Sequence, residues 1–173
     1  MLVEALTIKA SQLRTQMSGT IVLGIGNRLG GDDAAGTRLV DMLNRREHKA
    51  KTLHSRQITA IDGGTAPESY TSVIRQQRPE LLVLVDAADM ALPPGALRTI
   101  PPDKISVLSF SHHMPLSMFI SYVEEFCGNV LLIGVQPERT EMGGRISEAV
   151  RKSMNELVEA ILEGQVTEIP LLE

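Results

Sequence analysis

Three side chains with the chemistry of metal ligands stand just beyond segments typical of parallel β-strands. Asp33 ends a glycine-rich turn, Asp86 follows the apolar run 81–85, and His112 precedes a Met-Pro-Leu sequence. In an open α/β sheet, the carboxyl ends of parallel strands border the crevice where ligands bind. Two carboxylates and one imidazole that converge there would form an oxygen-rich metal site with a single nitrogen ligand.

The ligand set restricts the metal. Oxygen ligands with one imidazole suit nickel, manganese or zinc, and not copper or an iron–sulfur cluster. Three protein ligands leave coordination positions open for water or for groups on a partner. Because His112 and His113 are adjacent, only one can face the site if their segment is extended. Simpler roles stay open, since Asp86 can cap a following helix and a lone histidine is often only a hydrogen-bonded polar group.

The elements that must position these residues alternate between strands and helices. Strands are expected at residues 20–26, 57–61, 81–85 and 130–135, with a short edge strand at 96–100. Helices are expected at residues 34–46, 66–77, 115–126 and 145–162, with Asp32 or Asp33 as the first N-cap, Pro67 opening the second, and Gly128 and Gly164 ending the third and fourth. This order predicts an α/β fold, a three-layer α/β/α sandwich around a twisted, mostly parallel five-stranded sheet.

Length and composition limit the organisation of the chain. The 173 residues suffice for one domain, which we expect over residues 19–165. Residues 1–18 are expected to form an N-terminal extension, disordered or a short helix, and residues 166–173 a C-terminal tail. Met17 lies directly before the first expected strand and is an alternative start.

Charge and cysteine content exclude several classes of function. The net charge of −4 and the lack of a long basic run argue against nucleic-acid binding. The longest apolar runs have the length of strands, which argues against membrane insertion. The single cysteine, Cys127, cannot form an internal disulfide, so a cytoplasmic location is expected.

No strong nucleophile is visible in the sequence. Cys127 lies near the end of an amphipathic segment and is expected to be a buried core thiol. Neither a Gly-x-Ser-x-Gly elbow nor a His-Glu-x-x-His helix is present. A hydrolase built from this chain would therefore depend on a metal or on water activated by a carboxylate.

The segment Gly24-Ile25-Gly26, between a strand and a helix, raises the hypothesis of a nucleotide-binding domain. That fingerprint needs a small residue three positions later, where this chain has Leu29. Asp32 and Asp33 would also place negative charge where a pyrophosphate binds. The nucleotide hypothesis is therefore disfavoured, and we expect Asp32 to be a helix cap and Asp33 to be free to bind a ligand.

The sequence Asp62-Gly63-Gly64 follows the second expected strand. Its glycines allow a close approach of backbone to a ligand or a positive φ. A tight turn in which Asp62 accepts bonds from its own loop amides and a role in substrate binding are equally compatible with this pattern.

Taken together, the motifs resemble those of the hydrogenase maturation endopeptidases, which trim the C-terminus of the large subunit of nickel–iron hydrogenases. The chain is most similar to the type serving hydrogenase 3 and other formate-hydrogenlyase-like enzymes. The matching segments, in family order, are Gly24-Ile25-Gly26-Asn27, Gly31-Asp32-Asp33 with Gly36, Ile61-Asp62-Gly63-Gly64-Thr65-Ala66-Pro67-Glu68, Leu84-Val85-Asp86-Ala87-Ala88-Asp89-Met90, Ser111-His112-His113-Met114-Pro115-Leu116 and Gly134-Val135-Gln136-Pro137-Glu138.

The resemblance implies a role for each candidate residue. By position, Asp33, Asp86 and His112 are the implied nickel ligands and catalytic residues, and the turn at residues 62–64 is implied to bind the precursor. The implied reaction removes the C-terminal peptide from the nickel-loaded large-subunit precursor. The substrate supplies the nickel, for which other divalent ions can substitute in the isolated protein.

Two questions stay open at this level. The metal can serve only as an anchor for recognition, or it can polarise the scissile carbonyl or activate water. A non-catalytic chaperone that binds metal or precursor would use the same ligands and is the alternative to an endopeptidase.

Overall fold

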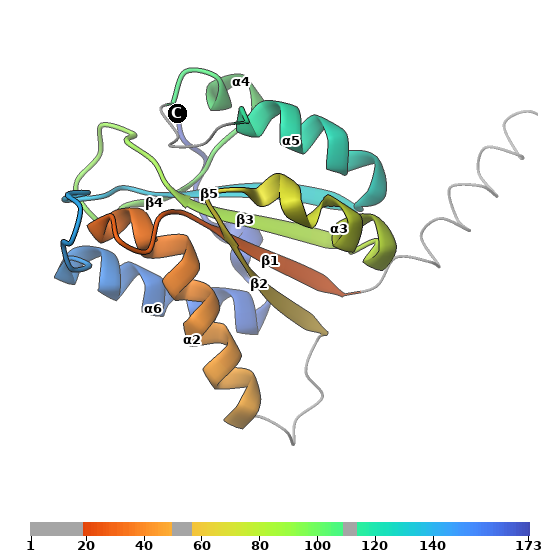
Figure 1. The fold of residues 1–173 in the computed structure, drawn as a ribbon, viewed down its shortest axis with the longest axis horizontal. Helices are drawn as coiled ribbons and strands as arrows, with labels where there is room; N and C mark the ends of the chain where they lie inside the picture. Colours follow the sequence, from red (N-terminus) through yellow and green to blue (C-terminus); the bar gives the residue numbers. More distant parts are fainter. Residues whose placement is uncertain (1–18, 50–56, 109–113) are drawn as a thin grey trace, which may run out of the picture.

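The computed structural model describes residues 19–49, 57–108 and 114–173, and it forms a five-stranded sheet between two layers of helices (Figure 1). The strands are β1 (Thr20–Ile25), β2 (Ile58–Gly64), β3 (Leu81–Ala87), β4 (Leu97–Thr99) and β5 (Asn129–Val135). Their order across the sheet is β2-β1-β3-β5-β4. All neighbours pair in parallel except β4, which is antiparallel to β5 at the edge. The predicted α/β sandwich is therefore confirmed.

The helices divide between the two faces of the sheet. Figure 1 shows α2 and α6 over one face and α3 and α5 over the other. The helical segments are η1 (Gly31–Ala34), α2 (Ala35–Lys49), η2 (Pro67–Tyr70), α3 (Thr71–Gln77), α4 (Pro102–Ile105), α5 (Leu116–Val123), η3 (Glu124–Phe126), α6 (Glu148–Glu163) and η4 (Val166–Glu168). Among the described residues, no helix has both the length and the apolarity needed to cross a bilayer.

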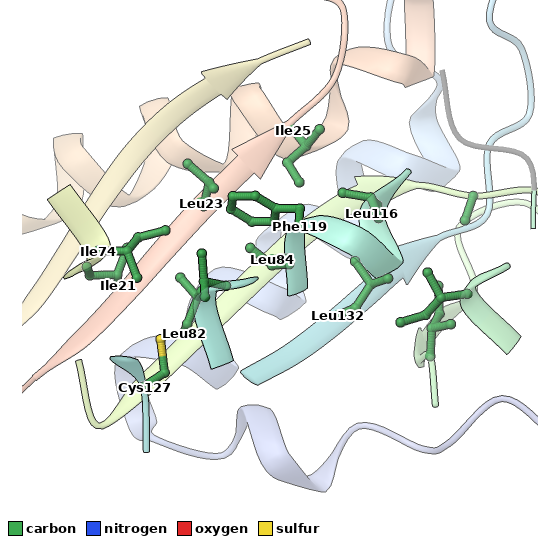
Figure 2. Close-up of a cluster of buried hydrophobic side chains, with 14 of the residues drawn as sticks. Ile21, Leu23, Ile25, Ile74, Leu82, Leu84, Leu116, Phe119, Cys127 and Leu132 are labelled. Atoms are coloured by element: carbon green, nitrogen blue, oxygen red, sulfur yellow. The ribbon is translucent and has the colours of Figure 1, made fainter. Parts of the chain in front are cut away.

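Alternation of side chains along the strands produces two separate cores. Leu82 and Leu84 of β3 belong to the core under α3 and α5, whereas Val83 and Val85 belong to the core under α2 and α6. Because both faces are covered, these central strands are continuously apolar, as is typical of parallel sheets. Figure 2 shows the ring of Phe119, from α5, lying among the strand side chains of the first core.

Several boundaries differ from the prediction for local physical reasons. β2 continues through Asp62, Gly63 and Gly64, because its pairing with β1 extends past a bulge opposite Gly24 and Ile25. The predicted helices at 66–77 and 115–126 each divide into a 3₁₀ turn and an α-helix. Gly128 directly follows Cys127, the C-cap residue of η3, as predicted, but it lacks the positive φ of a helix-ending glycine. A Cβ there would lie 2.4 Å from the Glu80 carbonyl oxygen, so glycine allows close chain packing.

The C-terminal residues pack along the edge strand. The amide of Thr99 donates to the carbonyl of Pro170 (2.8 Å), and the amide of Leu172 donates to the carbonyl of Thr99 (2.9 Å). Val166 of η4 is buried in the second core. The segment that follows α6 therefore covers part of the otherwise open edge at β4.

Helix α2 approaches the sheet unusually closely because of Gly36. A Cβ at this position would lie 2.2 Å from the Val85 carbonyl oxygen and 2.4 Å from that of Ile25. Gly24 on β1 has the matching role, since its Cβ would lie 2.1 Å from the Gly36 carbonyl oxygen. In a dinucleotide-binding fold, a small residue at position 29 would allow close packing of helix on strand. In this chain Gly36, seven residues later, allows it.

Gly36→Ala should therefore destabilise the domain by at least about 2 kcal/mol, since the added methyl group would overlap backbone on two strands. Asn44→Ala, on the exposed side of the same helix, should change the free energy of unfolding by no more than about 0.5 kcal/mol. Urea unfolding of both variants measures the difference. A Gly36→Ala variant as stable as the wild-type protein would contradict the packing described.

Candidate functional site

The candidate site lies at the carboxyl ends of β1 and β3, two neighbouring parallel strands whose following connections pass to opposite faces of the sheet. From β1 the chain passes to α2 on one face, whereas from β3 it passes, through β4 and α4, to α5 on the other. Such a switch point opens a crevice between neighbouring strands. Asp33 and Asp86 belong to the segments that border it.

Asp33 is held on η1 by a tight reversal of the chain after β1. Gly26 has a φ of 144°, and a Cβ there would lie 1.8 Å from the Asp33 carbonyl oxygen, so only glycine allows η1 to fold back. Asp33 Oδ2 accepts a hydrogen bond from the Asn27 amide at 3.2 Å. The carboxylate is partly exposed, and η1 packs directly against β3.

Asp86 lies inside β3 rather than beyond its end, in register with Gly134 of β5. It is only 1% exposed. Alternation along the strand places it on the face of Leu84, which is the face covered by α5. A carboxylate buried at this depth needs donors or a cation to offset its desolvation.

His112 and His113 fall outside the described residues, so the predicted role of His112 stays a prediction. The residues that flank them in the described chain, Leu108 and Met114, both pack against the core under α3 and α5. This is the face to which Asp86 belongs. Within the described residues, no group of three or more His, Cys, Asp or Glu side chains is arranged to hold a metal ion.

Asp32 is not the helix cap that the sequence suggested. η1 has Gly30 as its N-cap residue, without a side-chain cap, and Asp32 is fully buried. Its Oδ2 accepts hydrogen bonds from the amides of Glu138 (2.8 Å) and Arg139 (3.1 Å). Ser147 donates twice, from its amide to Oδ1 (2.6 Å) and from its hydroxyl to Oδ2 (2.8 Å).

These bonds fasten the loop between β5 and α6 to the turn that carries Asp33. The contact continues through the backbone, where the Asp32 amide donates to the Arg139 carbonyl (2.9 Å) and the Gly143 amide to the Leu29 carbonyl (2.7 Å). Ser147 is also the N-cap of α6, since its hydroxyl accepts from the Val150 amide. One buried carboxylate thus links η1, the 138–147 loop and the start of α6.

At positions 62–64 the structure shows an ion pair that the sequence did not predict. Arg28 donates to Asp62 Oδ2 (2.6 Å) and to both carboxylate oxygens of Asp41 (2.8 and 2.9 Å). Asp62 Oδ1 also accepts from the Gly64 amide (3.0 Å), so the predicted local loop bond is present, and the side chain stays partly exposed. A Cβ added at Gly64 would meet no atom within 4 Å, so space does not require glycine there. Its φ of 52° favours glycine instead.

The charges in this cluster shift its pKa values. Hydrogen bonds from Arg28 hold the pKa of Asp41 below its usual value, although partial burial opposes the shift. The two carboxylates in turn raise the pKa of Arg28. Arg38 also lies 3.8 Å from Asp41 Oδ2, so the two carboxylates are matched by two guanidinium groups.

Gln136 is a further positioning residue that sequence analysis did not single out. Its Oε1 accepts from the amides of Met90 (2.7 Å) and Leu92 (3.3 Å), and its Nε2 donates to Asp89 (3.2 Å). It therefore fixes the loop that follows Asp86. The motif Gly134-Val135-Gln136 was part of the resemblance, but its spacing alone does not identify the partners.

Cys127 is buried in the core, as predicted (Figure 2). Burial raises the pKa of its thiol to about 11. At neutral pH the thiolate is then a very small fraction, which argues against a nucleophilic role.

The fold and the site together define an α/β domain whose switch point carries carboxylates instead of a phosphate-binding loop. A sequence profile of the hydrogenase maturation protease (HycI) family matches residues 37–164. The hydrogenase 3 maturation protease of Escherichia coli K12 is 38% identical over 120 residues, which are 68% of this chain and 72% of that protein. A putative hydrogenase maturation protease of Methanocaldococcus jannaschii is 32% identical, over 83% of this chain and 86% of that protein.

Solved structures agree with the sequence relatives. The solution structure of the endopeptidase HycI from Escherichia coli has a TM-score of 0.78 and 31% identity, over 90% of this chain and 97% of that one. A nickel–iron hydrogenase maturation protease HycI from Thermococcus kodakarensis has a TM-score of 0.71 and 28% identity, over 86% of this chain and 92% of that one. The chain therefore belongs to the hydrogenase maturation protease family. The predicted peptidase class is confirmed, and the nucleotide-binding and chaperone alternatives are not supported.

Asp32→Asn should destabilise the protein by about 3 kcal/mol, because an amide cannot accept all four bonds and directs its NH₂ group at buried donors. Asp33→Asn is the matched neighbour: the bond that Asp33 accepts from the Asn27 amide can be kept by the amide oxygen, so the loss should be no more than about 1 kcal/mol. Denaturant unfolding compares the two. Equal losses would contradict the anchoring role of Asp32.

Proposed function

We propose that the chain removes the C-terminal peptide from the nickel-loaded large-subunit precursor of a nickel–iron hydrogenase, and that Asp33, Asp86 and His112 contact the nickel of that substrate. The observation that carries the proposal is that Asp33 and Asp86 border the same switch point in a member of this protease family. Cytoplasmic processing is part of the proposal and rests on the lone cysteine.

The chemistry of the donors fits this role. Carboxylate oxygens and an imidazole suit a borderline divalent ion such as nickel. Three ligands on this side are too few to close a structural site, so they can share a metal that the precursor already holds. The protease then need not keep a metal of its own, and other divalent ions can occupy the same ligands in isolation.

The proposed site has no side-chain nucleophile among its members. A water molecule must attack the scissile carbonyl, and a carboxylate near the crevice can take its proton. Asp33 is the better placed of the two carboxylates for this step, because it is partly exposed whereas Asp86 is buried. Asp86 would serve as the fixed ligand.

The turn at residues 62–64 is proposed to bind the precursor. Asp62 faces solvent in part, and both Asp62 and Asp41 are already paired with Arg28. A cationic group on the precursor can share these carboxylates without burying an unpaired charge.

Processing should require nickel in the precursor. With enzyme stripped by chelator, the nickel-loaded precursor should be shortened at its C-terminus and the apo precursor should not, as measured by mass spectrometry. Efficient cleavage of the apo precursor would show that the proposed ligands recognise something other than nickel.

Asp86→Asn should keep the wild-type circular dichroism spectrum but lose cleavage of the nickel-loaded precursor, because a charged ligand is replaced by a nearly isosteric neutral one.

His112→Ala should reduce the processing rate far more than His113→Ala, since only one of two adjacent side chains in an extended segment can face the crevice. Each variant serves as the control for the other, and initial rates of precursor shortening decide between them. Equal losses, or the reverse order, would mean that the ligand has been assigned to the wrong histidine.

A further inference from the structure

A groove outside the candidate nickel site lies between α5 and the η2–α3 segment. Its volume is 710 Å³, and its walls include Glu68, Thr71, Met114, Ser117, Met118 and Tyr122. The two helical segments lie over the same face of the sheet in Figure 1. No step of the proposed reaction uses this groove.

The α5 wall presents apolar side chains to solvent. Met118 is 62% exposed and Tyr122 is 49% exposed, and their spacing of four residues puts them on one side of the helix. Phe119, between them in sequence, is buried in the core and holds α5 in place. A large, exposed apolar pair on a rigid support is typical of a surface that binds a partner.

The opposite wall contains a carboxylate oxygen that lacks a partner. Glu68 lies in the first turn of η2, and its Oε2 is shielded from water. Within the part of the chain that the structure describes, this oxygen accepts no hydrogen bond. Shielded polar atoms without partners are unfavourable and rare in native proteins, so a donor that enters the groove would gain from pairing with Glu68.

Two residues that line the groove lie close in sequence to the segments that are proposed to act on the precursor. Glu68 follows Gly64 by four residues, and Met114 follows His112 by two. A polypeptide that leaves the crevice past either of these segments would reach the groove. The groove offers that polypeptide apolar contacts on one wall and an acceptor on the other.

We propose that this groove binds the C-terminal extension of the precursor, with an apolar side chain of the extension packed on Met118 and Tyr122 and a Lys or Arg side chain paired with Glu68. The inference rests on the proposed function, because it assigns a subsite for the same substrate. The charge complementarity at Glu68 distinguishes this occupant from a purely apolar one.

The apolar contact is tested by steady-state processing of the nickel-loaded precursor. Met118→Glu should raise KM roughly tenfold, as for loss of one buried apolar anchor, and leave kcat within about twofold. The control is Leu171→Glu, an equally exposed apolar residue (63%) beside the edge strand β4, which should leave both constants unchanged. A wild-type KM for Met118→Glu would overturn the subsite while the proposed function stands.

The charge contact is tested with Glu68→Gln, which keeps the shape of the side chain. Its KM should rise about threefold at low salt. The increase of KM with salt that we expect for the wild-type protein should flatten in this variant, because screening then has no ion pair to weaken. A salt dependence identical to that of the wild-type protein would show that no cation binds at Glu68.

Photocrosslinking identifies the occupant directly. With p-benzoylphenylalanine at position 118, illumination during processing should join this chain to the extension, and the adduct persists after cleavage. Crosslinks only to the mature part of the precursor, to a second copy of this chain, or to nothing would each overturn the proposal. If the wild-type protein does not shorten the nickel-loaded precursor at all, the proposed function fails and the subsite fails with it.

Discussion

The buried carboxylate of Asp32 is the constraint on which the geometry of the site depends. Four donors from the 138–147 segment converge on its two oxygens, and none of them belongs to its own turn. A charge at zero exposure is tolerated only when its acceptor sites are filled in this way. The turn after β1 is thereby tied to the loop after β5, two segments more than 100 residues apart in sequence. Asp33, the next residue, takes its position from this bond set and not from a helix cap.

Close backbone packing completes the same corner. Gly26 lets η1 fold back over the end of β1, and Gly36 lets α2 lie directly on β1 and β3. Without these contacts η1 could not remain against β3, where Asp86 is buried. The segments that carry Asp33 and Asp86 therefore border the switch point together, because glycine is placed where backbone touches backbone and because the Asp32 carboxylate fixes the neighbouring loop. In the motif Gly31-Asp32-Asp33, Asp32 thus anchors the turn, and Asp33 is the residue that we propose contacts the substrate.

Much of the fold was predictable from sequence because apolar periodicity reports burial directly. The continuous run at 81–85 and the apolar stripe on α6 predicted the central strand and the last helix, with ends that differ from the observed bounds by at most three residues. Asp32 was misassigned because a buried acceptor and an N-cap have the same local sequence, and the donors lie far along the chain. The ion pair of Arg28 with Asp41 and Asp62 was missed for the same reason. Long-range polar contacts leave no periodic signal, whereas packing does.

The weak intrinsic reactivity of the chain fits an enzyme that distributes recognition over several contacts. Its one thiol, that of Cys127, has a pKa raised to about 11 by burial, which argues against a thiolate nucleophile. Under the proposed function, nickel, the acidic turn at residues 62–64 and the groove beside α5 would each bind a different part of one precursor. Separate weak contacts on a single ligand reinforce one another strongly when geometry lets them act together. The full binding energy is then available only when the three contacts act on the same precursor. This requirement restricts cleavage to one peptide bond in one protein and protects other proteins from the protease.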